Sequence, residues 1–441
     1  MSDNGTLKAI RTAAPKADIA PRRRLPDYVV DGLTPQVAVS PRNAEETAAI
    51  LAAAARCEAV VIPWGGGTSM ATGATPLRYD VALDLTRMNA IVQYVPDDLT
   101  VAVQAGTRLQ DLQQHLAKRG QYLPLDPPLP NRATIGGIIA SNAGGPARHA
   151  HGWPRDWLLG LKIALPDGSV VKSGGRVVKN VAGYDMTKLL TGSFGSLGVI
   201  VEAAFKVMPL PPARATVAAF FPSASAAARA ALRLNARNLR VEALDVLNHE
   251  AAAAALPPGI DYPGGACLLV AAAGNSSAVE RTLYETKEIR NDDNAGGTSL
   301  SPEQAEATWQ QVRALSAQTA DAALLLRVAV LPSHAALFLE SAESIAAERA
   351  PTVRVDARPA LGVVRCCLDG ALNERAERLV RDLRGLAQKY GGDLVVEQCA
   401  VDMKSRIDVW GRSDAGGLMK SIKNALDPLA TLNRGRFVGG L

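Results

Sequence analysis

Residues 134–145 read TIGGIIASNAGG, and this stretch decides the fold. Two glycine pairs, Gly136-Gly137 and Gly144-Gly145, bracket an apolar run and the small polar side chains of Ser141 and Asn142. Glycine permits positive φ and close backbone approach, and successive free amides in such turns form a concavity for an anion such as a diphosphate. Paired glycines also occur in ordinary tight turns. The stretch alone therefore leaves a ligand-binding loop and a structural turn both open.

Two further glycine-rich segments favour the ligand-binding interpretation. PWGGGTS, residues 63–69, follows an apolar strand predicted for residues 59–62, and its glycines and hydroxyls can wrap phosphate oxygens without a lysine. The third segment runs from KNVAGYD (179–185) through a predicted helix over 186–190 to GSFGSLG (192–198) and a strand over 199–207. No Walker loop or GxGxxG pattern fits these glycines, which disfavours the common nucleotide-binding folds.

Composition indicates a globular protein of two or three domains, since 48% of the 441 residues are hydrophobic and 21% are charged. A net charge of +5 without a dense basic and aromatic cluster gives no support for nucleic-acid binding. No apolar run approaches the roughly 20 residues of a membrane span, and no signal sequence is evident, so we expect a cytoplasmic protein without integral membrane contact.

The five cysteines form no CxxC spacing, and the chain has only five histidines. Neither residue type occurs in a pattern typical of a zinc or iron–sulfur site, so no metal ligands are predicted. The cysteines are expected to be small core residues in a reducing compartment.

Beyond PLPP (209–212), predicted strands alternate with alanine-rich helices. The alternation occurs twice, which predicts two βαβ-type halves that form one antiparallel sheet with helices on one face. At the start of the chain, residues 1–34 are polar and are expected to form a loosely held arm. Asn43 followed by Glu46 predicts the start of a helix.

The three glycine-rich segments together resemble the FAD-binding (PCMH-type) domain of the vanillyl-alcohol oxidase superfamily, in its type 4 oxidase and D-2-hydroxyacid dehydrogenase branch. PWGGGTS resembles the pyrophosphate loop of that family, TIGGIIASNAGG its second FAD loop and KNVAGYDMTKLLTGSFGSLGVIVEA its third. The resemblance implies an α+β fold with an N-terminal arm (1–34), a two-subdomain FAD-binding domain (35–212), an antiparallel-sheet cap (213–414) and a C-terminal segment (415–441) that returns to the flavin.

The resemblance also implies which residues hold the cofactor. Attachment is expected to be non-covalent, because the pyrophosphate loop contains neither histidine nor cysteine. In the tail, LNRGRF resembles the turn that comes back to the flavin, although Arg434 stands where the family has proline. The FAD contacts implied are Pro63, Trp64, Gly65, Gly66, Gly67, Thr68, Ser69, Asp126, Thr134, Gly136, Gly137, Ser141, Asn142, Gly144, Gly145, Gly195, Gly198, Val199, Ile200, Asn433 and Arg436.

The sequence offers fewer candidates for catalytic residues than for cofactor contacts. Arg436 could supply positive charge at the N1–O2 edge of the flavin, or it could be a solvated terminal arginine. Arg327, within the apolar strand LLLRVAV, needs an anionic partner, which could be a substrate carboxylate or a buried acidic residue. Lys179 and Tyr184 could reach the flavin or substrate, and Lys179 could instead brace Asp185 or a phosphate.

Enzymes of this branch carry an HxGDGNxH-like motif in the cap, and this chain has nothing similar. Together with the run GGRVVKNVAGYDMTKLLTGSFGSLGVIVEAAFKVMP (174–209), this difference makes the chain resemble the FAD-binding E subunits of bacterial glycolate oxidases. That resemblance implies oxidation of glycolate or another small 2-hydroxy acid in a heteromeric complex, with a metal-motif flavoprotein subunit and an iron–sulfur subunit as partners. The complex would be cytoplasmic or peripheral to a membrane through those partners. A flavin-bearing relay subunit without its own substrate and a self-sufficient dehydrogenase remain alternatives.

Overall fold

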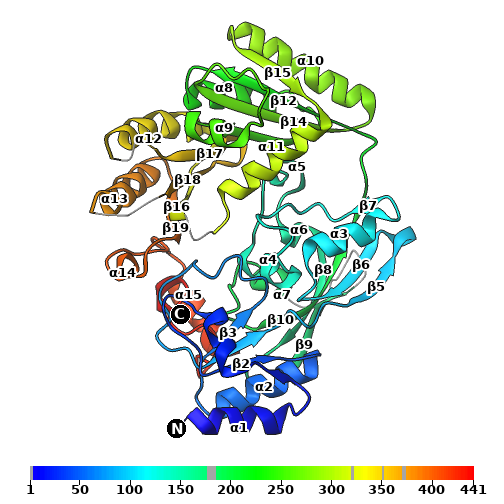
Figure 1. Ribbon diagram of the computed structural model, residues 1–441, viewed down its shortest axis with the longest axis vertical. Coiled ribbons are helices and arrows are strands. Elements are labelled where there is room, and N and C mark those ends of the chain that lie inside the picture. The colour runs from blue at the N-terminus through cyan, green and yellow to red at the C-terminus, as the bar shows by residue number, and fades with distance from the viewer. Residues whose placement is uncertain (1–2, 176–184, 319–321, 350–351, 370–373) are drawn as a thin grey trace. The chain divides into compact units, whose positions relative to one another are not determined.

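The computed structural model describes residues 3–175, 185–318, 322–349, 352–369 and 374–441. The chain divides into two compact units, which can be followed by colour in Figure 1. The first unit consists of Met1–Gly144, Trp153–Leu210 and Arg412–Leu441, and the second consists of Gly145–Gly152 and Pro211–Gly411. The first unit is therefore assembled from both ends of the chain.

The first unit begins with a four-stranded sheet in the order β1-β2-β4-β3. β2 (Val37–Ser40), β4 (Val81–Asp84) and β3 (Val61–Trp64) are parallel, and β1 (Asp18–Ile19) is antiparallel to β2. The helix α2 (Ala44–Arg56) packs on this sheet. Its start confirms the predicted cap, because the Asn43 side chain accepts a hydrogen bond from the Glu46 amide at 2.8 Å.

The prediction of a loosely held N-terminal arm is wrong for its first part. Residues Asp3–Ala13 form the helix α1, which lies against α2 (Figure 1). Ile10 is fully buried, and Leu7 packs against the same core. These apolar residues recur at helical spacing within an otherwise polar segment, so one narrow face of the helix is enough to hold it.

A five-stranded antiparallel sheet completes the first unit, in the order β5-β6-β10-β8-β9. Its core also receives side chains from α3 (Leu109–Ala117) and α4 (Ile135–Ser141). The strands are β5 (Ile91–Val95), β6 (Thr100–Gln104), β8 (Leu158–Ala164), β9 (Val170–Gly174) and β10 (Val199–Lys206). The remaining elements are η1 (Arg22–Tyr28), η2 (Pro96–Asp98), β7 (Gln121–Tyr122), α6 (Pro154–Trp157), α7 (Met186–Leu190), β11 (Met208–Pro209), α15 (Gly416–Leu426) and η5 (Val438–Gly440).

The second unit is built on one eight-stranded antiparallel sheet in the order β15-β12-β14-β13-β17-β18-β16-β19. Strands β12–β15 and β16–β19 form two halves that meet where β13 pairs with β17. The second half has the order βαββαβ, and the first has the same order with one further helix between β13 and β14. This arrangement confirms the antiparallel cap sheet. The strands are β12 (Ala213–Phe221), β13 (Val241–Leu247), β14 (Ala266–Gly274), β15 (Gly296–Leu300), β16 (Ala322–Ala329), β17 (Arg354–Arg358), β18 (Val363–Asp369) and β19 (Asp393–Gln398).

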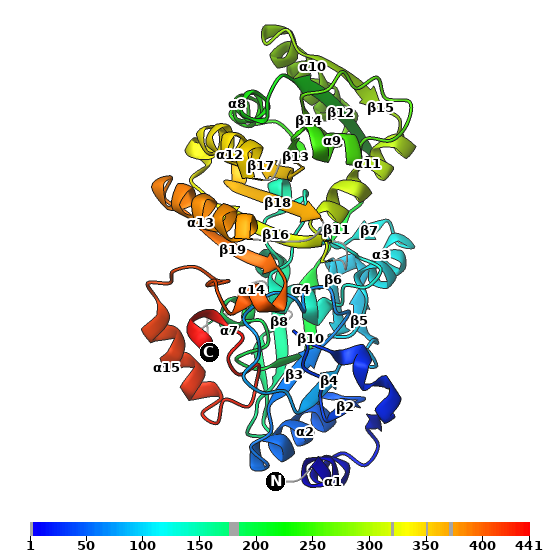
Figure 2. The ribbon, with the colours of Figure 1, turned by 60° about the vertical axis from the view of Figure 1, so that its left-hand side comes forward.

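Helices cover both faces of this sheet, which corrects the expectation of helices on one face. The helices α8 (Ala224–Asn235), α10 (Ser276–Asp292), α12 (Ala335–Arg349) and α13 (Glu374–Lys389) lie on one face (Figure 2). On the other face, α9 (His249–Ala255) and α11 (Pro302–Leu315) pack on Ala218 and Phe220 of β12. The alternate residues of that strand are also apolar and buried, so both faces of the strand require a cover. Short elements are α5 (Arg148–His151), η3 (Pro332–His334), η4 (Pro359–Leu361) and α14 (Val401–Lys404).

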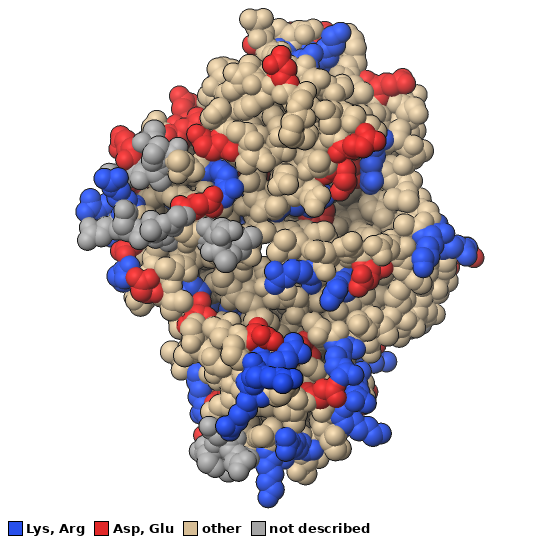
Figure 3. All heavy atoms as spheres, in the orientation of Figure 1, with Lys and Arg blue, Asp and Glu red and all other residues tan. Residues whose placement is uncertain are grey.

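Charge differs between the two units on the face drawn in Figure 3. Lys and Arg side chains gather over the first unit, whereas the second unit shows mixed charges. Exposed arginines of the first unit include Arg22, Arg23 and Arg24. Such a surface attracts anionic ligands. Within the described residues, no helix is both long and apolar enough to cross a bilayer.

Candidate cofactor site

The three glycine-rich segments meet at one pocket of the first unit, with an empty volume of about 450 Å³ that is partly open to solvent. Each segment arrives from a different element: the first follows β3, the second forms α4 and the third leads into β10. Residues from three distant parts of the sequence therefore line the same pocket. The lining residues are Pro63, Trp64, Gly65, Leu85, Ala105, Thr134, Gly136, Gly137, Ala140, Phe194, Gly195, Gly198, Val199 and Ile200.

The first two loops touch so closely that side chains could not fit between them. A Cβ on Gly65 would lie 2.2 Å from Thr134 Oγ1, and a Cβ on Gly66 would lie 1.8 Å from the carbonyl oxygen of Arg132. A Cβ on Gly136 would lie 2.8 Å from Ala105 Cβ. Glycine is required here by close approach of the backbone, which keeps main-chain amides at the pocket wall.

The second loop is the start of a helix. Thr134 caps α4, because its Oγ1 accepts a hydrogen bond from the Gly137 amide at 3.4 Å. The helix ends at Asn142, whose φ of 51° is left-handed. Ser141 directs its hydroxyl to the Gly137 carbonyl at 2.7 Å, so it supports the helix instead of facing the pocket.

The third loop is held by its glycines and by its helix cap. Gly195 has a φ of +67°, and a Cβ on Gly198 would lie 2.7 Å from Ile163 of β8. The Asp185 side chain caps α7 through the Thr187 amide at 3.1 Å. Two candidates for chemistry in this loop, Lys179 and Tyr184, lie outside the described residues.

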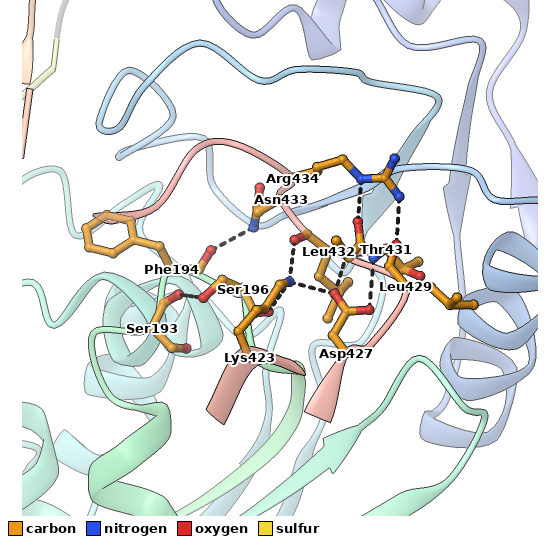
Figure 4. Close-up of polar contacts among 11 residues, drawn as sticks. Ser193, Phe194, Ser196, Lys423, Asp427, Leu429, Thr431, Leu432, Asn433 and Arg434 are labelled. Carbon is orange, nitrogen blue, oxygen red and sulfur yellow. Dashed lines mark hydrogen bonds and ion pairs between the residues drawn. The ribbon is translucent and has the colours of Figure 1, made fainter. Parts of the chain in front are cut away.

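The C-terminal tail contacts both the first and the third loop. Its backbone pairs with β3, since the Val61 amide donates to the Thr431 carbonyl at 2.8 Å and the Asn433 amide donates to the Val61 carbonyl at 3.0 Å. Asn433 Nδ2 donates to the Phe194 carbonyl at 2.7 Å, as Figure 4 shows. Phe194 and Gly195 line the pocket, so the tail acts on the pocket through the backbone of the third loop.

Arg436 does not reach the pocket lining. Its guanidinium is buried and donates to the carbonyls of Met70 at 2.6 Å and Thr72 at 2.9 Å, and burial lowers its pKa. These bonds brace the chain after the first loop, and a positive charge of Arg436 beside the flavin stays a prediction. Arg434 supports the same turn, with bonds to the Ala430 and Leu429 carbonyls (Figure 4). Its side chain thereby fixes the turn at the position where the family has proline.

Some residues that line the pocket were not predicted, and some predicted cofactor contacts do not line it. Leu85, Ala105, Ala140 and Phe194 were missed. Leu85 and Ala105 directly follow strands, and Ala140 and Phe194 lie within the second and third glycine-rich segments, so these positions were the available signals. Predicted residues that line the pocket are Pro63, Trp64, Gly65, Thr134, Gly136, Gly137, Gly195, Gly198, Val199 and Ile200. Gly66, Gly67, Thr68, Ser69, Asp126, Ser141, Asn142, Gly144, Gly145, Asn433 and Arg436 lie outside the lining, and cofactor contacts by them stay predictions.

In the second unit, Arg327 has a protein partner. Its Nε donates to Glu397 Oε1 at 2.8 Å, which favours the structural ion pair over the substrate clamp. Burial alone would raise the pKa of Glu397, but the guanidinium groups of Arg365 and Arg327 outweigh it, so that this pKa is lowered. A second buried cluster joins Arg358 to Asp245 at 3.0 Å and to Asp356.

Among the residues that the structure describes, no group of three or more His, Cys, Asp or Glu side chains could hold a metal ion. His149 and His151, the histidines next to the second loop, belong to the second unit. His151 Nε2 lies 3.8 Å from Glu242 Oε1, and burial lowers the pKa of His149.

The pocket suits a flavin dinucleotide. Five glycines in its lining leave backbone accessible to a diphosphate, while Trp64 and Phe194 offer apolar surface to a ring system. Fold and pocket together define an FAD-dependent oxidoreductase.

Comparison with known families agrees with this class. The FAD binding domain family matches residues 35–174, and the C-terminal domain family of FAD linked oxidases matches residues 210–437. Since the second match covers more than half of the chain, the protein belongs to the FAD linked oxidases.

Similar proteins include two glycolate oxidase subunits. Subunit GlcD of Bacillus subtilis is 28% identical over 417 residues, which are 91% of this chain and 89% of that protein. Subunit GlcE of Escherichia coli is 42% identical over 132 residues, 30% of this chain and 38% of that protein. The solved structure of p-cresol methylhydroxylase with substrate bound is 16% identical, has a TM-score of 0.76 and aligns over 98% of this chain and 96% of its own. This last likeness shows the PCMH-type fold.

Proposed function

We propose that this chain is the FAD-binding subunit of a complex that oxidises glycolate to glyoxylate and passes the electrons to a partner. The observation that carries the proposal is the pocket formed by three converging glycine-rich loops, because it accounts for a redox cofactor. The similarity to GlcD over most of both chains, and the higher identity to GlcE over a shorter stretch, support a 2-hydroxy acid as substrate.

Bound FAD supplies a two-electron acceptor for the hydride that leaves the hydroxyl-bearing carbon. The chain's own residues bind the diphosphate through loop amides and keep water from the ring through Trp64 and Phe194. Lys179 and Tyr184 are proposed to face the substrate. Basic side chains gathered over this unit favour the approach of an anionic hydroxy acid (Figure 3).

Partners follow from what the described residues lack. Their histidines, cysteines and acidic groups form no metal-binding cluster, and the five cysteines, all described and four of them buried, form no disulfide. We therefore propose a metal-motif flavoprotein subunit and an iron–sulfur subunit as partners that take over substrate activation and onward electron transfer.

An alternative is a relay subunit that carries FAD without a substrate of its own. The ion pair between Arg327 and Glu397 favours it, because the best candidate for a carboxylate clamp is already engaged. A self-sufficient dehydrogenase with Tyr184 as base is a third candidate, and retained turnover in Tyr184→Phe would eliminate that version.

Anaerobic mixing of the purified FAD-loaded chain with glycolate, and separately with D-lactate, separates the first two candidates. Bleaching of the flavin absorbance by glycolate is expected if the chain oxidises this substrate, and it would eliminate the relay-only role. If glycolate bleaches the flavin only after co-expression with the partner subunits, the site requires the complex. If neither the chain nor the complex is bleached, the proposal is wrong.

A further inference from the structure

Lys423 is buried in a helix whose other residues are exposed or half-buried. Within α15, whose residues are all described, it is the one buried side chain, with 4% of that side chain exposed. All three ammonium donors find oxygen partners: the Ser196 carbonyl at 2.7 Å, Asp427 Oδ2 at 2.6 Å and the Leu432 carbonyl at 2.9 Å (Figure 4). A buried ammonium with full hydrogen bonding holds a defined geometry.

Asp427 organises the turn that follows the helix. Its carboxylate is fully buried and accepts the Thr431 amide at Oδ1 and the Leu432 amide at Oδ2, both at 2.8 Å. The Lys423–Asp427 pair thereby fixes residues 427–432 as one rigid turn. This turn delivers Thr431 and Asn433 to their backbone bonds with Val61 of β3.

The pair thus connects two loops of the cofactor pocket through the tail. Ser196, which accepts from Lys423, stands between Gly195 and Gly198 in the third loop, and both glycines line the pocket. Val61 stands two residues before Pro63, the first lining residue of the first loop. A shift of the turn would therefore displace the third loop and the start of β3 together.

We propose that Lys423, together with Asp427, is a positioning device for FAD: it holds the first and third loops at the separation that the cofactor requires. A buried ion pair is often no more stabilising than an apolar pair of the same shape, and in some proteins such a pair specifies one geometry. This inference rests on flavin binding and not on the identity of the substrate. A failure of the proposed glycolate oxidation would therefore leave it unaffected.

The test is FAD affinity of the full-length chain, measured by fluorescence titration of apoprotein. Lys423→Met is expected to raise the Kd by about tenfold or more and to alter the visible absorption bands of the bound flavin. Lys420→Met is the matched control, because Lys420 lies on the same helix and is exposed. Ile10→Ala controls for lost stability, since Ile10 is buried in α1 and does not line the pocket.

Both controls are expected to keep the wild-type Kd within twofold. If Lys423→Met fails to fold, Lys423→Met with Asp427→Asn removes the charge from both partners and is expected to show the same loss of affinity. Hydrogen exchange of the wild type provides a measurement without any variant: FAD must slow exchange of amides 431–433, because coupling between two sites is reciprocal. An unchanged Kd in folded Lys423 variants, or unchanged exchange in the tail, would overturn the inference.

Discussion

Replacing Gly66 by alanine tests whether close packing of the first two loops forms the cofactor site. Real Cβ contacts stay beyond 3.0 Å, and the added Cβ would lie 1.8 Å from the Arg132 carbonyl oxygen, so the loops must separate by at least about 1.2 Å. Because the added Cβ would meet a backbone carbonyl and is itself fixed to the backbone, no side-chain rotation relieves the clash. Gly65, which lines the pocket, would move with its neighbour.

The magnitude follows from the hydrogen bonds that such a shift breaks. With the diphosphate bound by the loop amides as we propose, a displacement of this size removes at least one amide from a charged oxygen, and a hydrogen bond to a charged group contributes about 1.5–3 kcal/mol. The Kd for FAD should therefore rise by roughly tenfold to a hundredfold. The assay is titration of apoprotein with FAD, together with circular dichroism to establish that the variant is folded.

Gly385→Ala is the control for the substitution itself. Gly385 lies within α13, and an added Cβ would meet nothing within 4 Å, so this variant should keep the FAD affinity and gain roughly 0.5–1 kcal/mol of stability. A Gly66→Ala protein that binds FAD within twofold of the wild type and melts at the same temperature would refute the reasoning.

Two further predictions concern the buried charges of the second unit. Arg358→Met should destabilise the protein by about 3–5 kcal/mol, because it leaves Asp245 buried without its cation; a lower urea midpoint checks this, and an unchanged midpoint would contradict it. The pKa of Glu397 is lowered in the folded state, since Arg365 and Arg327 outweigh the effect of its burial. Its stabilising contribution is therefore present above the unfolded pKa and is lost as pH falls through the lowered folded value. Thermal melts of Glu397→Gln should accordingly lose part of the decline in stability that the wild type shows on acidification below pH 4.5, and a parallel decline in both proteins would count against this assignment.

The sequence was most informative where the structural cause is local. Three glycine-rich segments were enough to predict the pocket, because a glycine lacks a Cβ in any context and therefore allows close backbone approach. The strands around the loops and the cap at Asn43 were predicted for the same reason, from apolar runs and from a side chain that bonds to its neighbour.

Long side chains were predicted less well, because their partners come from distant parts of the chain. Arg436 lies more than 360 positions from the carbonyls that it binds, and Arg327 lies 70 positions from Glu397. The sequence indicated that Arg327 needs an anion but could not distinguish a substrate from a glutamate. Helix α1 was missed because its apolar face is narrow and its sequence is otherwise polar.

The division of the chain also has a consequence for biosynthesis. All strands and long helices of the second unit lie in one uninterrupted stretch, Pro211–Gly411, which can complete its sheet while the ribosome is still translating. The first unit cannot complete its fold at that point, because Val61 of β3 lacks its backbone partners until Thr431 and Asn433 emerge from the exit tunnel. Newly made chains should therefore acquire the ability to retain flavin only after residues 431–433 have been synthesised, when the stretch Pro211–Gly411 can already have folded.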